Sequence, residues 1–232
     1  RGRNTSLIFF KKSGIKCMIF EYNSNKDTYS DTKECVIMKV EAIYDLKDVQ
    51  RLHTYIKDNG SPRDLLLYSL GINTGFRIKD ILALKKEDVL GDTITIDESK
   101  TKDRKDGKNR PPRVVGITPQ LKRDLENYIY MIKPGGYLFP STKANKQGEY
   151  VISTTQAYRI LNKYTHAIGL DINVGCHTLR KTWGYHMYQK YKDVAFLMKA
   201  FNHSKESMTL LYIGASQVEI VEKTRDLDFG IM

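Results

Sequence analysis

Apolar residues recur at helical spacing from residue 45 onward. Leu46, Val49, Leu52 and Ile56 fall on one face of a helix, and Gly60 stands where that helix should end. This spacing predicts an amphipathic helix.

The next helix carries its own start signals. Ser61 is a favoured N-cap, Pro62 takes the first helical position, and Asp64 lies in the first turn, where an acidic side chain is stabilising. The residues at 65–70 are nearly all apolar, so most of this helix should be buried. The Thr-Gly pair at 74–75 is expected to end it.

A third helix is expected after Arg77, and a small sheet follows it. The apolar residues of this helix are Ile78, Ile81, Leu82 and Leu84. Alternation at 93–96 and again at 113–118 predicts two antiparallel strands. The connection between them, 97–112, is crowded with lysine and arginine, so it should project into solvent or into a groove of DNA.

The remainder is predicted to be helical apart from a loop at 133–152. Helices are expected at 119–132, from Ser153 to about 168, and at 178–189, 192–201, 205–213 and 216–226. Many helices with one small antiparallel sheet indicate a predominantly α-helical α+β domain.

Residues 1–37 show no helical or alternating pattern that lasts more than a few positions. We therefore expect an N-terminal extension at 1–41, without predicted order, followed by one domain at 42–232. Met38 opens the regular part, which suggests the hypothesis that it is the natural start of the protein.

The net charge narrows the choice of partner. A formal charge of +11 and a pI near 9.4 favour an anionic partner, either nucleic acid or an acidic membrane surface. Apolar runs such as 65–70 are far too short to span a bilayer, and no segment combines a dense basic helical face with an apolar one. Nucleic acid is therefore the expected partner.

The cysteines and the first residues indicate a location in the cell. Cys17, Cys35 and Cys176 are odd in number, far apart and without CxxC spacing, so neither a disulfide framework nor a zinc site is indicated. The apolar piece at 7–10 is cut off at once by two lysines, well short of a secretion signal. We expect a reducing, cytoplasmic location and no metal or other cofactor.

Five residues supply the chemistry for breaking a phosphodiester without a metal. Arg77 and Arg180 suit the non-bridging phosphate oxygens, because a guanidinium is planar, always charged and offers paired donors. His177 and His203 are poised for proton transfer near neutral pH. Tyr212, nine positions after His203, is the candidate nucleophile, and its phenol needs a base or a positive pocket.

Each of these residues also has an ordinary explanation. An arginine at a helix start is most often a surface charge, and a histidine three positions before an arginine occurs by chance in many proteins. Tyr212 lies among aliphatic residues, as a packed aromatic would, and the chain has 15 tyrosines. Cys176 is interpreted as a small buried thiol rather than a nucleophile. The order and spacing of all five residues together carry the functional interpretation.

These segments resemble the tyrosine recombinase, or phage integrase, family over about residues 42–226. Thr-Gly-Phe-Arg-Ile-Lys-Asp at 74–80 is similar to the first arginine box of the family, with Asp80 where glutamate is usual. Cys-His-Thr-Leu-Arg-Lys-Thr at 176–182 is similar to the HxLRH box, with Lys181 in place of the second histidine.

Two further segments carry the resemblance. Phe-Asn-His-Ser at 201–204, with Tyr212, is similar to the LGH box and its tyrosine. Asn202 stands where glycine is usual, and asparagine is the next residue most willing to adopt the left-handed conformation before a helix. In the family an active lysine sits in the β-hairpin, and we favour Lys100 over Lys102 because it follows the first strand directly.

The resemblance implies the tyrosine recombinase catalytic-domain fold and a mechanism. Tyr212 would attack the scissile phosphate, form a 3′-phosphotyrosyl bond and release a 5′-hydroxyl, while the two arginines hold the non-bridging oxygens. Lys100 would be the general acid for the leaving oxygen, His177 the acid/base that assists the tyrosine, and His203 a hydrogen-bonding stabiliser of the phosphate. Neither metal nor ATP is implied.

The resemblance also implies partners. These are double-stranded DNA, a homotetramer on paired sites and nucleoid association. Relatives usually carry an upstream core-binding domain, so an accessory DNA-binding protein stays open here. An apolar stripe at Val218, Ile220 and Val221 would pack on the chain's own core or on a neighbouring subunit. A type IB topoisomerase-like relaxing activity and a non-catalytic DNA-binding factor are the alternative functions.

Overall fold

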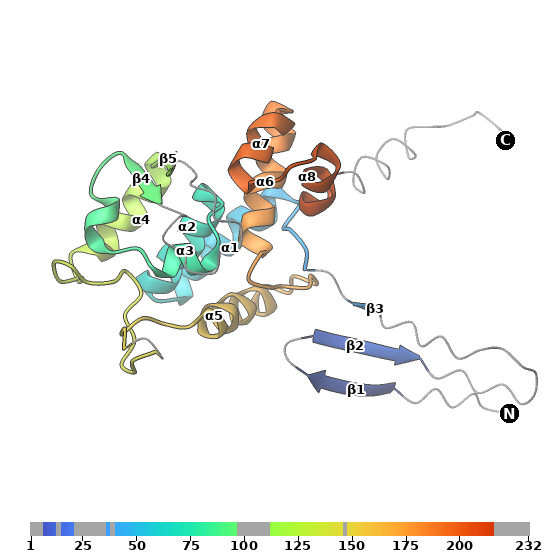
Figure 1. Cartoon of the computed structure of the whole chain (residues 1–232). Coiled ribbons are helices and arrows are strands. Elements are labelled where there is room, and N and C mark those ends of the chain that lie inside the picture. The colour runs from blue at the N-terminus through green and yellow to red at the C-terminus, as the bar shows by residue number, and fades with distance from the viewer. Residues whose placement is uncertain are drawn as a thin grey trace, which may run out of the picture. The chain divides into compact units, whose positions relative to one another are not determined.

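The computed structural model describes residues 7–12, 15–20, 36–37, 40–96, 112–145 and 148–215 (Figure 1). The chain divides into two compact units, Arg1–Val40 and Glu41–Met232. All helices among the described residues lie in the second unit.

The first unit contains a three-stranded antiparallel sheet in the order β1-β2-β3. Its strands are β1 (Leu7–Lys12), β2 (Ile15–Phe20) and β3 (Val36–Ile37), and Leu7 pairs with Phe20 at one end of the first ladder. The sequence left the order of residues 1–37 open, and the structure places these three strands there. The strands are at most six residues long, so a period has no room to stand out in the sequence, and pairing between segments creates the sheet.

The described residues of the second unit form helices and one pair of strands, which confirms the predicted α+β class. No helix within the described ranges is long and apolar enough to cross a membrane. In chain order the elements are α1 (Leu46–Asn59), α2 (Pro62–Thr74), α3 (Ile78–Leu82), the 3₁₀ helix η1 (Lys86–Val89), β4 (Thr93–Ile96), β5 (Arg113–Gly116), α4 (Pro119–Ile129), α5 (Thr154–Ala167), α6 (Thr178–Tyr191), α7 (Val194–Phe201) and α8 (Glu206–Ile213).

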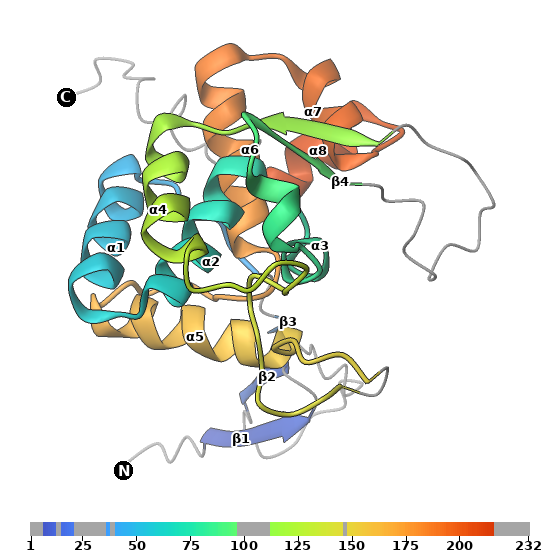
Figure 2. The ribbon, with the colours of Figure 1, turned by 90° about the vertical axis from the view of Figure 1, so that its left-hand side faces the viewer.

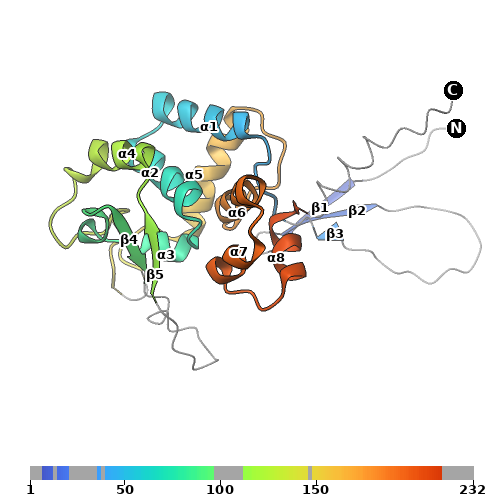
Figure 3. The same ribbon diagram turned by 90° about the horizontal axis from the view of Figure 1, so that it is seen from above.

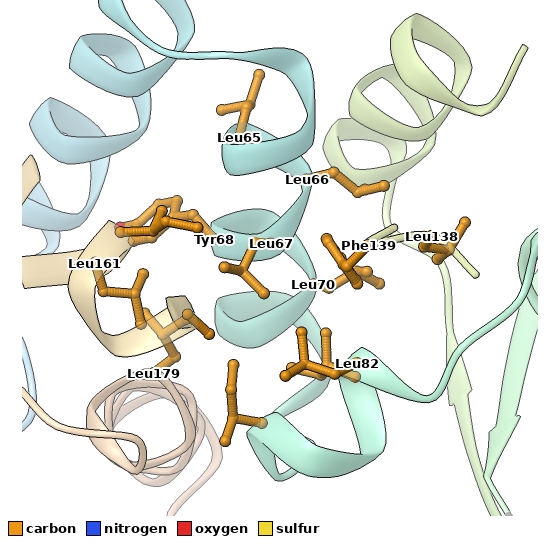
Figure 4. Close-up of a cluster of buried hydrophobic side chains, with 14 of the residues drawn as sticks. Leu65, Leu66, Leu67, Tyr68, Leu70, Leu82, Leu138, Phe139, Leu161 and Leu179 are labelled. Atoms are coloured by element: carbon orange, nitrogen blue, oxygen red, sulfur yellow. The ribbon is translucent and has the colours of Figure 1, made fainter. Parts of the chain in front are cut away.

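Helix α2 runs through the centre of the larger hydrophobic core. Ser61 caps it as predicted, accepting the N–H of Asp64 at 3.2 Å, and every residue at 64–71 is buried. A helix that is apolar on nearly all sides requires neighbours all round. Figure 4 shows side chains from the surrounding elements converging on it, among them Leu82, Phe139, Leu161 and Leu179.

Helices α2 and α6 touch at two glycines of α2. A Cβ on Gly71 would collide with Leu179, and a Cβ on Gly75 would collide with the indole of Trp183. The two glycines are four residues apart, as are their two partners, so each pair lies one helical turn along a shared face. This close approach brings the end of α2 against the first turns of α6.

A smaller hydrophobic cluster joins α6, α7 and α8, which lie together in Figure 3. Its buried members are Trp183, Tyr185, Leu197, Phe201, Ile213 and Ala215. Trp183 and Tyr185 are therefore packing aromatics of this cluster. Gly184 belongs to the same contact, because a Cβ there would collide with Phe201.

The two predicted strands pair antiparallel, and Ile96 is the partner of Arg113 at one end of the ladder. In Figure 2 the β5 arrow starts on the side of the larger unit where α6, α7 and α8 lie, and it runs toward α4. The lysine-rich connection at 97–111 lies outside the described residues, as does the helix expected at 216–226.

Several helix ends differ from the predicted bounds. Helix α3 stops at Leu82, so Leu84 lies beyond it, and α4 stops at Ile129 rather than near 132. Helix α8 begins at Glu206, one residue later than expected. All three differences fall at helix ends, where the backbone bonds of the last turn are easily exchanged for turns.

A buried carboxylate links α1, α2 and α4. Asp124 is 3% exposed, and its oxygens accept hydrogen bonds from Ser69 at 2.5 Å and Gln120 at 3.0 Å, with His53 at 2.9 Å. Burial alone would raise the pKa of Asp124, but the hydrogen bonds from His53 and Ser69 outweigh it and lower the pKa. The network therefore favours the ionised carboxylate in the folded state.

Replacing Asp124 by asparagine should lower the free energy of unfolding by about 2–3 kcal/mol at pH 7. The hydrogen bonds to the buried negative charge are lost, and one of the buried donors around it then faces the NH2 group of the asparagine, which cannot accept its hydrogen bond. A lowered folded-state pKa stabilises the protein above the unfolded pKa of about 4, and this contribution is lost as pH falls through the folded pKa. Urea unfolding of both proteins between pH 3 and pH 7 should show the difference shrinking toward acid.

The matched control is Asp92→Asn. Asp92 is 93% exposed and lies 3.5 Å from the Lys122 ammonium, so its loss should change stability by less than about 1 kcal/mol. Equal losses in the two variants, or an Asp124 effect independent of pH, would contradict the role given to the buried network.

Candidate active site

Arg77 emerges from the turn that ends α2. Gly75 closes this helix in the left-handed conformation, with φ of 58°, which glycine adopts without steric cost. Arg77 is then the N-cap residue of α3, and its guanidinium lies 4.0 Å from the carboxylate of Asp80. The side chain of Arg77 is 39% exposed, so it is the member of the arginine pair that reaches the surface.

Arg180 lies in the first turn of α6 and is only 3% exposed. Its Nη1 donates to the Gly75 carbonyl at 2.6 Å, and its Nη2 donates to the Ala200 carbonyl at 3.4 Å. The guanidinium also lies over the ring of Phe201, 4.6 Å from its centroid. These contacts hold the guanidinium plane between the end of α2 and the end of α7.

His177 and Tyr212 form a direct pair. His177 is the N-cap residue of α6, and its Nδ1 lies 3.0 Å from the Tyr212 hydroxyl, across 35 residues of sequence. The two rings meet edge to face with their centroids 6.2 Å apart. The phenol can donate in this pair when Nδ1 is the unprotonated nitrogen of the imidazole.

His203 follows the residue that closes α7. Asn202 takes the left-handed conformation, with φ of 61° and ψ of 47°, which confirms the conformation predicted for it, although it ends one helix instead of opening the next. His203 Nδ1 lies 3.0 Å from the Thr209 hydroxyl, and its ring centroid lies 5.2 Å from that of Tyr212. Thr209 thereby orients the imidazole beside the candidate nucleophile.

Tyr212 is the second-last residue of the eight-residue helix α8 and is partly exposed. Its ring packs on Phe201 at 5.2 Å, and the Lys181 ammonium lies 5.3 Å from its centroid. The helix ends at Gly214, with φ of 77°, where a Cβ would collide with the hydroxyl of Tyr44. Phe201 thus packs on the ring of Tyr212, and Tyr44 contacts the residue that ends the Tyr212 helix.

The side chains of His177, His203 and Tyr212 are partly buried and lie close to two positive charges. Burial lowers the pKa of His177 and of His203, and the charges of Arg180 and Arg77 lower both further. Burial raises the pKa of Tyr212, although the same two arginines oppose that rise. Before a phosphate arrives, both imidazoles are therefore neutral and the phenol is protonated at neutral pH.

Five of the six residues predicted for the site lie together in the structure. Arg77 and Arg180 come from the end of α2 and the start of α6, and their charges act on both histidines and on Tyr212. The sixth, Lys100, lies outside the described residues, as does its rival Lys102.

Two cations close to the site were not among the predicted catalytic residues. Lys181 is 7% exposed beside Tyr212, and Arg113 on β5 donates to the same Gly75 carbonyl as Arg180. The strand alternation offered a signal for Arg113, since it shares a strand face with Val115 and Ile117, which pack on the core. For Lys181 the sequence offered only its position directly after Arg180, in a helix that was expected to pack against the rest of the domain.

The arrangement suits acid–base and nucleophilic chemistry on an anion. A phenol hydrogen-bonded to a neutral imidazole can lose its proton, and two guanidinium groups nearby can stabilise negative charge in the transition state. Within the described ranges, no three histidine, cysteine, aspartate or glutamate side chains form a group that could hold a metal ion.

Known protein sequences are similar to this chain. The sequence profile of the phage integrase family matches residues 43–218. The probable integrase/recombinase YoeC of Bacillus subtilis (strain 168) is 40% identical over 179 residues, which cover 77% of this chain and 91% of YoeC. A tyrosine recombinase of Pseudothermotoga lettingae is 30% identical over 72% of this chain and 54% of its own length. The chain thus spans most of YoeC but about half the length of other curated relatives it matches.

Solved structures share the fold. The crystal structure of XerA recombinase aligns with a TM-score of 0.61 at 18% identity, over 83% of this chain and 67% of that one. The XerH site-specific recombinase, bound to its palindromic difH substrate in a post-cleavage complex, aligns with a TM-score of 0.56 at 22% identity, over 72% and 48% of the two chains. This likeness confirms the tyrosine recombinase catalytic-domain fold predicted from the sequence.

Because the charges of Arg77 and Arg180 lower the pKa values of both histidines, the proximity of Arg77 can be tested by titration. In an NMR titration, His177 and His203 should titrate below about 6.5, the ordinary histidine value. Burial contributes most to this lowering and would persist in Arg77→Gln, but the Arg77 charge would be gone, so both pKa values should rise. Arg51→Gln removes a guanidinium on α1 and should leave both values unchanged. Unchanged values in Arg77→Gln would show that Arg77 does not share the site.

Proposed function

This chain belongs to the phage integrase family of site-specific tyrosine recombinases, and on that premise we propose that it cleaves and rejoins double-stranded DNA through Tyr212. The observation that supports this assignment best is the pair formed by His177 and Tyr212, with 3.0 Å between Nδ1 and the phenol oxygen. A phenol is a weak nucleophile while protonated, and a neutral imidazole at this distance can accept its proton.

The proposed cleavage step is a transfer of the phosphate to tyrosine. The Tyr212 oxygen forms a bond to the scissile phosphorus while the phenolic proton passes to His177 Nδ1. The bond from phosphorus to the 5′-oxygen breaks, and that oxygen leaves with the electron pair and takes a proton from a general acid. A 3′-phosphotyrosyl link and a 5′-hydroxyl result, and attack by the 5′-hydroxyl of a partner strand reverses the step.

The arginines and the second histidine are proposed to hold the phosphate. Arg77 and Arg180 would stabilise the charge that grows on the non-bridging oxygens, a contribution that single preorganised donors make at about 3–4 kcal/mol each. The two backbone carbonyls that hold Arg180 keep its guanidinium plane fixed before DNA binds. His203, oriented through Nδ1 by Thr209, would donate from Nε2 to a phosphate oxygen.

Lys100 is proposed as the general acid for the leaving 5′-oxygen. The motif resemblance supports this role, and Ile96, the last residue of β4, lies four positions before it. Lys102 is the competing candidate on the same connection.

We propose that residues 42–232 act as the catalytic unit on paired DNA sites, in a homotetramer, in the cytoplasm at the nucleoid. The net charge of +11 supports binding to DNA. Relatives are named integrases and recombinases, which favours strand exchange over DNA relaxation or non-catalytic binding. The matched region covers about half the length of relatives such as the Pseudothermotoga lettingae recombinase. We therefore propose that an upstream segment or an accessory DNA-binding protein makes further contacts with the DNA.

The first test is capture of the covalent intermediate. The protein is incubated with a pool of nicked duplexes whose sequence around the nick is randomised, so that the leaving strand diffuses away and cleavage is trapped. A protein–DNA adduct stable on a denaturing gel is expected, and sequencing the trapped strand gives the preferred site. Tyr212→Phe should abolish the adduct, because the nucleophilic oxygen is gone.

Tyr130→Phe is the matched control, since Tyr130 is 70% exposed and lies directly after α4. It should form the adduct at the rate of the natural protein. Persistence of the adduct in Tyr212→Phe would assign the nucleophile to another residue. Absence of any adduct from the natural protein, with DNA bound, would favour a non-catalytic binding factor.

The general acid can be identified from the leaving group. Lys100→Ala should slow adduct formation by about 10²–10⁴-fold on ordinary DNA, the usual contribution of a general acid. A substrate with sulfur at the 5′-bridging position leaves as a thiolate, which needs no proton, so the variant should recover on it. Lys102→Ala is the matched control and should react like the natural protein on both substrates. Recovery confined to Lys102→Ala would transfer the role to Lys102.

A further inference from the structure

We propose that Arg113 is a positioning residue for the two phosphate-binding arginines. It holds the turn from which Arg77 emerges and shares with Arg180 the carbonyl that fixes the Arg180 guanidinium. The inference rests on the proposed function, because it assigns to Arg113 a part in that same reaction without contact to DNA.

The contacts of Arg113 converge on the end of α2. Its Nη2 donates to the Thr74 carbonyl at 2.6 Å, and its Nη1 donates to the Gly75 carbonyl at 3.3 Å. Arg180 on α6, which is 105 residues from Gly75 along the chain, donates to the same Gly75 oxygen at 2.6 Å. Two guanidinium groups from different elements therefore bind one backbone oxygen.

The position is chemically suited to a cation. The last carbonyls of a helix lack intrahelical partners and form the negative end of the helix dipole. Thr74 and Gly75 carry two such carbonyls, and the planar fork of one guanidinium reaches both. A lysine has three donors but no planar fork, so it would not hold the two carbonyls in one fixed geometry.

Aromatic faces hold the Arg113 guanidinium in place. Its Cζ lies 4.8 Å from the centroid of Phe76 and 5.2 Å from that of Trp183. Phe76 directly precedes Arg77, and Trp183 is the residue that Gly75 packs against on α6. Arg113 thus joins β5 to the turn and to α6 at one point.

The consequence for catalysis follows from the geometry of the turn. Arg77 is two residues beyond Gly75, and its backbone carbonyl accepts the N–H groups of Asp80 and Ile81 that start α3. A shift of the Thr74 and Gly75 carbonyls would therefore move Arg77 and remove the anchor of Arg180 together. Misplacement of preorganised donors by about 1 Å can cost about 10²-fold in rate.

The experiment compares two substrates that differ in the charge of the scissile group. A methylphosphonate replaces one non-bridging oxygen with a methyl group, so it lacks the negative charge that the arginines stabilise. On the sequence trapped from the nicked pool, Arg113→Met should slow adduct formation by about 10²-fold relative to the natural protein, and this loss should shrink to about tenfold or less on the methylphosphonate. Arg77→Met is the positive control and should show the same contrast.

Arg51→Met is the matched negative control. Arg51 also donates to a backbone carbonyl, that of Ile168 at 2.8 Å, but it lies on α1. Its variant should react like the natural protein on both substrates. Thermal unfolding of each variant is measured alongside, and Arg113→Lys, which keeps the charge but not the fork, replaces Arg113→Met in the comparison if the latter does not fold.

Two outcomes would overturn the proposal. An Arg113 variant that reacts at the natural rate has no positioning role. A loss that is equal on both substrates shows that Arg113 acts on the leaving group or on general folding, and not through the charge-stabilising arginines. Failure of the proposed function is distinguishable, since the natural protein would then form no adduct at all.

Discussion

Two glycines allow α2 and α6 to pack closely, and the arrangement of the site depends on that contact. Helix α2 delivers Arg77 through the turn at its end, and α6 carries His177 and Arg180 at its start. Because Gly71 and Gly75 admit Leu179 and Trp183, those two helix termini meet. A side chain at either glycine would push the two helices apart and would thereby separate Arg77 from Arg180.

The contact between α2 and α6 also brings the positive charges of Arg77 and Arg180 together in a partly buried place. Burial and the two arginines keep the histidines neutral, while burial keeps the phenol protonated. An anion bound there would be attracted by both guanidinium groups, and that attraction is little screened in a partly buried place. The backbone carbonyls of Gly75 and Ala200 both accept hydrogen bonds from the Arg180 guanidinium and so fix its orientation.

Local signals allowed much of this to be predicted. Ser61, Pro62 and Gly75 set the limits of α2, and Asn202 takes the left-handed conformation that its side chain tolerates. Short-range rules did not identify the N-terminal strands, whose order comes from pairing between segments. The role of Arg113 was not predicted either, because its partners are carbonyls and aromatic rings from distant parts of the chain.

The contact between Tyr44 and Gly214 joins the beginning of the larger unit to the end of α8, the helix that carries Tyr212. The preceding residue, Ile43, is hydrogen-bonded to α6. Its N–H donates to the Thr182 hydroxyl, and its carbonyl oxygen lies 3.0 Å from His186 Nε2. The segment before α1 is consequently part of the support of Tyr212. An expressed fragment that begins at Leu46 would keep all six residues proposed for the site, yet it would lose the contact that supports the end of the Tyr212 helix.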